Sequence, residues 1–206
     1  MSHAEPMSFR AHAPIVPVTA RGAATRRKLL SAAELEFGDK GFHSASVSSI
    51  TLRAGVGQGT FYLYFRTKEE IFVTLVQEIG RALRQHSAET LARCAGSAET
   101  ERACVDSFIE FAKRHPGRLR IVQEAQFVDE PVFRDYYASL AATYGKSLSR
   151  ARGGADSEPG EASAWAIMGI GHFIAMRYCL WQGQPPEAPM LAQAMRLLSH
   201  STPAMN

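Results

Sequence analysis

The fold is decided by residues 46–70, which read SVSSITLRAGVGQGTFYLYFRTKEE. Apolar residues at helical spacing predict two short helices in this stretch, at 47–54 and 58–65, and Ser46 is a suitable N-cap for the first. The intervening residues 55–57, Gly-Val-Gly, predict a tight turn, because glycine adopts turn conformations at little steric cost. Two short helices joined by a glycine-containing turn are typical of a helix-turn-helix.

The faces of these two helices differ in the way that such a motif requires. Val47, Ile50 and Ala54 share one side of the first helix, which we expect to pack inward and to support the second. On the second helix, Phe61 and Phe65 are four residues apart and should both point inward. The other residues are then left on the outer side, where a helix can enter a groove about 12 Å wide. They are Gln58, Gly59, Thr60, Tyr62, Leu63 and Tyr64.

Helices are predicted on both sides of this motif. Upstream, an apolar stripe predicts a helix from about residue 22 to Gly41, where glycine can adopt the left-handed conformation and Phe42 can fold back onto the last turn. Downstream, Thr67 and Glu70 form a capping-box pattern. Lys68 lies beside this cap, at the wrong end of the helix for its dipole, which indicates an interaction outside its own helix.

No strand pattern follows residue 67, and the fold class is therefore all-α. The expected architecture has about nine helices, with a three-helix head followed by a larger helical body. Helices of the body are predicted at 67–94, 98–115, 117–127, 130–152, 160–183 and 187–200.

The net charge of +3 is concentrated in the N-terminal third of the chain. Residues 1–70 contain nine lysines and arginines against six acids, whereas residues 71–206 contain fourteen of each. A basic end on a neutral body suits a polyanion such as nucleic acid, although a solvated basic tail has the same composition.

The sequence indicates a cytoplasmic protein without a membrane segment or secretory signal, because no apolar run approaches 18 residues. Its three cysteines, Cys94, Cys104 and Cys179, are widely spaced and resemble neither a disulfide framework nor a metal motif. We therefore predict no metal site and no cofactor.

Residues 37–72 resemble the DNA-binding region of the TetR/AcrR family of bacterial regulators. The matching positions are Phe37, Gly41-Phe42, Ser46-Val47, Ile50, Ala54-Gly55-Val56, Gly59-Thr60-Phe61-Tyr62, Tyr64-Phe65 and Lys68-Glu69-Glu70. Two positions depart from the family pattern. Gly57 replaces a common serine or threonine N-cap, and Thr51 replaces a common alanine, so that its hydroxyl needs a partner.

The resemblance implies roles for individual residues of the head. The groove-facing set would be Gln58, Gly59, Thr60, Tyr62 and Leu63. Tyr64 and Lys68 would contact phosphates, as would Ser46 at a helix N-terminus, where free N–H groups favour an anion. Arg26 could add a phosphate or minor-groove contact. For each of these residues a purely structural role, as packing aromatic, cap or solvated lysine, is the alternative.

The expected organisation is a flexible basic arm (1–20), a helix-turn-helix DNA-binding domain (21–66), and an effector-binding and dimerisation domain (67–206). A short recognition helix contacts few bases, so a homodimer on a palindromic operator is expected. The nearly uninterrupted apolar helix at 165–181, together with the last helix, is the predicted dimer interface. Its candidate residues are Gly169, Phe173, Met176, Leu191 and Met195.

Aromatic residues between the head and the dimer helices could line an apolar effector pocket, although ordinary core packing accounts for each one individually. The candidate pocket residues are Phe108, Phe111, Gln123, Phe127, Tyr137, Trp165 and Met168.

The predicted function is sequence-specific binding of double-stranded DNA by a repressor that a small apolar or amphipathic effector releases. A redox- or metal-responsive regulator of the same fold is an alternative, as is activation instead of repression. A helical enzyme is a further one, but the chain has no nucleophile elbow, phosphate-binding loop or zinc-type spacing.

Overall fold

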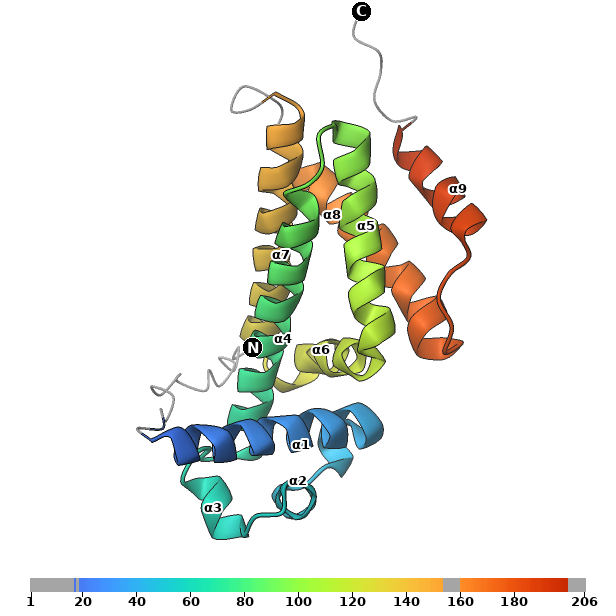
Figure 1. Ribbon diagram of the computed structural model, residues 1–206. Helices are drawn as coiled ribbons and strands as arrows, with labels where there is room; N and C mark the ends of the chain where they lie inside the picture. Colours follow the sequence, from blue (N-terminus) through green and yellow to red (C-terminus); the bar gives the residue numbers. More distant parts are fainter. Residues whose placement is uncertain (1–16, 18, 154–159, 200–206) are drawn as a thin grey trace, which may run out of the picture.

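The computed structural model describes residues 17, 19–153 and 160–199. The predicted arm at 1–20 therefore lies almost wholly outside the described residues. Within these ranges the regular structure is all helical, as predicted, and Figure 1 shows its order. The helices are α1 (Ala20–Ser44), α2 (Val47–Ala54), α3 (Gln58–Tyr62), α4 (Lys68–Leu91), α5 (Ser97–Arg114), α6 (Pro116–Val128), α7 (Glu130–Ala151), α8 (Glu161–Ala175) and α9 (Ala188–Ser199), with a π-helical turn at Met176–Trp181.

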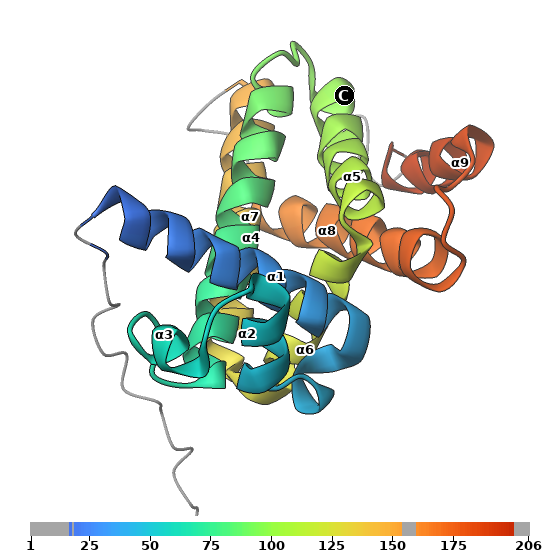
Figure 2. The same ribbon diagram turned by 60° about the horizontal axis from the view of Figure 1, so that its bottom comes forward.

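The helices form two layers of different size. Helices α4, α5 and α7 stand roughly side by side, with α8 crossing them, and α9 lies apart at one edge (Figure 1). Helices α1, α2 and α3 lie across the lower end of α4, and α6 runs between α1 and the body (Figures 1 and 2). The buried apolar residues of both layers form one continuous cluster. The small layer is thus attached to the body by a shared core.

Two predicted helix boundaries need correction, and the predicted end of the first helix at Gly41 is confirmed in part. The first helix continues through Ser44, although Gly41 interrupts it with a φ of 80° and a ψ of 164°. This φ is positive as predicted, but the ψ lies outside the left-handed helical region. The recognition helix ends at Tyr62, because the chain turns at Leu63. The predicted helix at 160–183 changes to π-helical bonding from Met176.

Gly41 has a second reason to be glycine. A Cβ at this position would lie 2.7 Å from an oxygen of Glu124, a residue of α6. The same carboxylate accepts a hydrogen bond from the backbone N–H of Phe42. The ring of Phe42 folds back as predicted, with its centroid 5.8 Å from that of Phe37 and 4.9 Å from that of Phe72.

Helices α1 and α6 come close enough at one point for their backbones to touch. A Cβ on Gly38 would lie 3.3 Å from the Cα of Gly117, so a larger residue at either position would push the two helices apart by a few tenths of an ångström. Beside this contact, Arg118 forms a two-pronged ion pair with Glu34, at 2.7 and 3.1 Å. Arg120 donates to the carbonyl of Gly38 at 2.9 Å.

A buried carboxylate joins α1 to α2. Glu36 is only 2% exposed and receives the Arg53 guanidinium at 2.6 Å and the Lys40 ammonium at 2.8 Å. The pKa of Glu36 falls from 4.5 to about 2, chiefly because Lys40 hydrogen-bonds to the charged form. Because the folded-state pKa is lowered, this stabilisation is present above pH 4.5 and is lost as the pH falls toward 2.

We predict that Glu36→Gln lowers the free energy of unfolding at pH 7 by about 1–3 kcal/mol, since it removes a charged acceptor from buried partners. The difference from the unsubstituted protein should shrink steadily below pH 4.5. Urea denaturation over a pH series measures it. Glu110→Gln, which removes an exposed pair with Arg114, is the control and should cost under about 0.5 kcal/mol. A difference that stays constant down to pH 3 would contradict this account.

Candidate nucleic-acid interface

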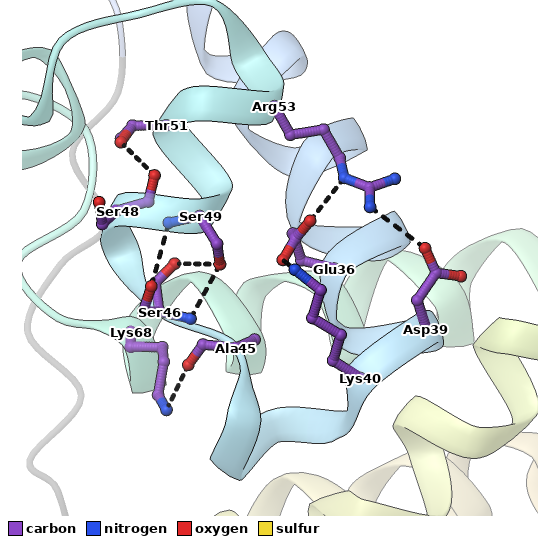
Figure 3. Close-up of polar contacts among 10 residues, drawn as sticks. All are labelled: Glu36, Asp39, Lys40, Ala45, Ser46, Ser48, Ser49, Thr51, Arg53 and Lys68. Atoms are coloured by element: carbon purple, nitrogen blue, oxygen red, sulfur yellow. Dashed lines mark hydrogen bonds and ion pairs between the residues drawn. The ribbon is translucent and has the colours of Figure 1, made fainter.

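The N-terminus of α2 is closed by a reciprocal pair of serines. The Ser46 hydroxyl accepts the backbone N–H of Ser49 at 3.0 Å, and the Ser49 hydroxyl accepts that of Ser46 at 3.1 Å (Figure 3). This is a capping box with serine in the position usually held by glutamate or glutamine. The backbone of α2 thus begins in a fixed direction, without a carboxylate that would repel an anion there.

Polar contacts within α2 and between α2 and α1 fix the position of this helix. The buried Thr51 hydroxyl donates to the carbonyls of Val47 and Ser48, at 2.9 and 3.0 Å, which supplies the partner that the sequence called for. Arg53 reaches from α2 to Glu36 and Asp39 on α1 (Figure 3). These contacts fix the support on which α3 rests.

Helix α3 presents one side to the core and the other to solvent. Phe61 and Phe65 are 0% and 1% exposed, as their spacing predicted. Tyr62 and Leu63, by contrast, are 54% and 66% exposed. Large apolar side chains held in water on a short, well-supported helix form a surface suited to contact with a partner.

The remaining groove-facing candidates also lie on this helix. Gln58 and Gly59 are exposed, Thr60 is half-buried, and a Cβ on Gly59 would meet nothing within 4 Å. Gly57 forms the N-cap without a side-chain hydrogen bond. We name the exposed surface of Gln58, Gly59, Tyr62 and Leu63 the α3 face.

One exposed residue of the head was not anticipated. Leu52 on α2 is 83% exposed, which is more than either Tyr62 or Leu63 of the α3 face. The apolar stripe of α2 predicts only a supporting role for this helix. The signal was available, because Leu52 falls off the stripe formed by Val47, Ile50 and Ala54.

Lys68 has a structural role inside the protein, and its predicted contact with a phosphate stays a prediction. Its ammonium donates to the carbonyls of Phe42 and Ala45, at 2.8 and 2.9 Å (the second is drawn in Figure 3). It also lies 4.2 Å from the centre of the Phe42 ring. Lys68 lies at the unfavourable end of the α4 dipole because its ammonium binds the carbonyls of Phe42 and Ala45 at the end of α1.

Arg26 is likewise engaged inside the protein. Its guanidinium lies 3.4 Å from Glu78 on α4 and 5.1 Å from the centre of the Phe65 ring. Tyr64 is half-buried and packs against the core. Its hydroxyl would lie 3.4 Å from a Cβ on Gly22, so it contacts the start of α1. Arg27 and Lys28, the next two residues after Arg26 on α1, are exposed.

The structure does not gather the candidate pocket residues into one cavity. Phe108 and Met168 are buried, and Tyr137 lies 3.3 Å from the Nδ1 of His172 in an aromatic cluster. Phe111 and Gln123 are half-buried. The body has one groove between α8 and α9 and another between α4 and α7, and no candidate pocket residue lines either of them.

Two of the candidate pocket residues, Phe127 and Trp165, are exposed. Phe127 is 83% exposed, because it lies on the side of α6 away from the buried Val122 and Ala125. Trp165 is 46% exposed and falls on the same stripe of α8 as Gly169 and Phe173.

An apolar groove of about 490 Å³ runs between α8 and α9. Among the dimer candidates, Gly169 and Phe173 line it, Leu191 is buried, and Met195 and Met176 are partly buried against the core. Phe173 is 68% exposed. The full lining is Gly169, Ile170, Phe173, Ile174, Arg177, Tyr178, Met190 and Ala194.

The thiols are poorly suited to reaction as thiolates. Burial raises the pKa of Cys104 to about 12 and also raises the pKa of Cys94 and Cys179. Within the described ranges no three His, Cys, Asp or Glu side chains are grouped to hold a metal ion. A search of the same ranges found no helix long and apolar enough to span a membrane.

Comparison with known proteins places the head in a family. Residues 29–75 match the family described as bacterial regulatory proteins, tetR family. The head of the chain is therefore similar to the tetR family. A stretch of 65 residues is 45% identical to the HTH-type transcriptional regulator YdgC of Bacillus subtilis (strain 168). This match spans 32% of the chain and 33% of that protein, so the chain is aligned to about a third of its relative.

Solved structures extend the likeness in fold to the body. A TetR-family regulator from Syntrophomonas wolfei is 18% identical, with a TM-score of 0.70, covering 89% of this chain and 99% of that one. The regulator FadR of Bacillus subtilis, solved in complex with stearoyl-CoA, is 18% identical with a TM-score of 0.67, covering 84% and 96%. A TetR-like regulator from Rhodococcus sp. RHA1 is 22% identical with a TM-score of 0.68, covering 87% and 98%.

We predict that Lys68→Met lowers the free energy of unfolding by about 2–4 kcal/mol, because it removes two charge-assisted hydrogen bonds to carbonyls. Chemical denaturation without DNA measures this. The matched control is Lys28→Met, which removes the same charge from an exposed position of α1. Equal stability of the two variants would show that Lys68 does not hold the turn after α1.

Proposed function

We propose that this protein is a tetR-family transcriptional repressor that reads a DNA operator with the α3 face. The observation that carries the proposal is the exposure of Tyr62, the last residue of α3, and of Leu63, which follows it. On the opposite side, Phe61 and Phe65 are buried. Tyr62 offers a hydroxyl and a ring, and Leu63 offers an apolar surface for thymine methyl groups in the major groove. Gly59 allows close approach, since open space surrounds its Cα.

Phosphate contacts position this face on the duplex. The N-terminus of α2, closed by Ser46, and the hydroxyl of Tyr64 are the proposed contacts from the motif itself. Because Arg26 is bound to Glu78, the exposed cations Arg27 and Lys28 are better placed to supply long-range attraction.

The proposed assembly is a homodimer formed across the groove between α8 and α9. The exposed fractions of Trp165, Phe173 and Trp181 are 46%, 68% and 67%, and such large exposed apolar side chains favour burial against a second copy. A dimer also supplies the second reading helix that a palindromic operator requires, with half-sites about 34–36 Å apart.

The proposed control is release from the operator by a small effector bound in the body. The body touches the head at two places, since α4 carries Lys68 and Glu78 while α6 carries Glu124 and Arg118. An effector that binds one arrangement of these helices better shifts the spacing of the two heads. FadR of Bacillus subtilis, bound to stearoyl-CoA, supports an amphipathic effector.

A thiol-based redox sensor is the second candidate of the same fold, but the raised thiol pKa values weigh against it. The small-molecule effector is therefore the proposed signal.

We predict that Tyr62→Ala weakens binding to the operator about 10-fold or more, because it removes a base-reading side chain. Gel shift with the DNA flanking the gene, at two salt concentrations, measures the affinity and its salt slope. Since Tyr62 contacts no phosphate in this account, the slope should be unchanged. Leu35→Ala, at a 52% exposed apolar position of α1, is the matched control. Unaltered binding by Tyr62→Ala would contradict the assignment of the α3 face.

We predict that Phe173→Asp yields a monomer, since a buried, unpaired carboxylate at the interface is costly. Sedimentation velocity measures the assembly. Phe127→Asp alters another exposed phenylalanine, at 83% exposure on α6, and should leave the dimer intact. A dimeric Phe173→Asp protein would place the interface elsewhere.

A further inference from the structure

A second groove lies on the side of the body, between α4 and α7. It has a volume of about 240 Å³ and is separate in its lining from the groove at α8 and α9. Its floor is buried, with Val76, Gly80 and Val132, and its rim is polar. The full lining is Val76, Gln77, Gly80, Arg81, Arg84, Val132, Asp135 and Tyr136.

Two side chains converge over Gly80 at the bottom of this groove. A Cβ on Gly80 would lie 3.0 Å from the Nη1 of Arg84 and 3.1 Å from the ring of Tyr136. The glycine therefore lets a guanidinium and a phenol lie together against the backbone of α4. Arg84 is half-buried, and Tyr136 is 5% exposed.

Neither polar group has a partner within the part of the chain that the structure describes. The Arg84 guanidinium makes no ion pair or hydrogen bond there, although most arginines of the body do. The Tyr136 hydroxyl likewise makes no hydrogen bond, while the nearby Tyr144 hydroxyl donates to the carbonyl of Cys104. A half-buried cation beside an unpaired donor is costly without an anion.

The Tyr136 hydroxyl is reached from the groove. Among the described residues, every side-chain nitrogen or oxygen that is sealed from solvent has a hydrogen-bond partner. The unpaired hydroxyl is therefore in contact with solvent, and the groove is the opening that Tyr136 lines. Burial raises the pKa of Tyr136, so the hydroxyl keeps its proton and remains a donor.

We propose that this groove binds the oxyanion of a small molecule, a carboxylate or a phosphate, between the Arg84 guanidinium and the Tyr136 hydroxyl. A guanidinium presents its N–H donors in a plane that matches two oxygens of such a group, and the phenol supplies a third donor. At the rim, Arg81 adds a second positive charge. The carboxylate of Asp135 also lies at the rim, where it accepts a hydrogen bond from the Ser139 hydroxyl at 3.4 Å. Its negative charge repels the ligand and so disfavours an anion of high charge.

The test is a titration of ¹⁵N-labelled full-length protein with inorganic phosphate or with acetate, at constant ionic strength set by chloride. It needs no DNA and does not rest on the proposed repressor function. We expect a saturable shift of the Arg84 side-chain resonance with at least one of the two anions. A response to phosphate alone assigns a phosphate ester, and a response to acetate alone assigns a carboxylate.

Variants distinguish this site from general charge. Arg84→Gln should weaken anion binding about 10-fold or more, and Tyr136→Phe about 3- to 5-fold, which is the loss of one hydrogen bond. Tyr136→Phe removes only an unpaired hydroxyl, so its thermal midpoint should not fall. The matched control is Arg114→Gln, an exposed arginine of α5 paired to Glu110, and it should bind like the unsubstituted protein. No saturable response, or undiminished binding by Arg84→Gln, would overturn the proposal.

Discussion

The arrangement of the head depends on how the chain satisfies its backbone between α1 and α2. The positive φ of Gly41 breaks the helix and leaves the N–H of Phe42 and the carbonyls of Phe42 and Ala45 without helical partners. A cation from α4, Lys68, binds the two carbonyls, and an anion from α6, Glu124, binds the N–H. Unpaired backbone groups at a buried turn are costly, so this one turn requires both body helices to be in place.

The α3 face inherits its position from that turn. Helix α2 leaves it in the direction set by the paired serines and is held to α1 by Arg53 and the buried Glu36. Helix α3 has only five residues, and an isolated helix of that length is not stable. Its exposed Tyr62 and Leu63 are therefore held in place by Phe61, Phe65 and the helices behind them.

Local patterns in the sequence predicted most of this head and little of the body's chemistry. Spacing alone placed Phe61 and Phe65 inward, because period and burial are coupled within one short helix. It could not show that Lys68 reaches a turn 23 to 26 residues away, since such contacts depend on tertiary packing. For the same reason Arg84 and Tyr136, on helices far apart in sequence, gave no sign of meeting over Gly80. Aromatic composition was a poor guide to a pocket, because it did not say which side of α6 carries Phe127.

The backbone contact between Gly38 and Gly117 limits how this protein can be recombined with others. A head grafted from another regulator brings its own α1, and a side chain at position 38 would press on the backbone of α6, so that the two helices would have to move apart by a few tenths of an ångström. It would also have to supply a carboxylate for Arg118 and carbonyls aligned with Arg120. Exchange of specificity therefore calls for a unit that includes α6 as well as the helix-turn-helix. In sequence, that unit is discontinuous, because α6 begins at Pro116, 54 residues after Tyr62 at the end of α3. A transplant must therefore be spliced at both ends of α6 as well as around the helix-turn-helix.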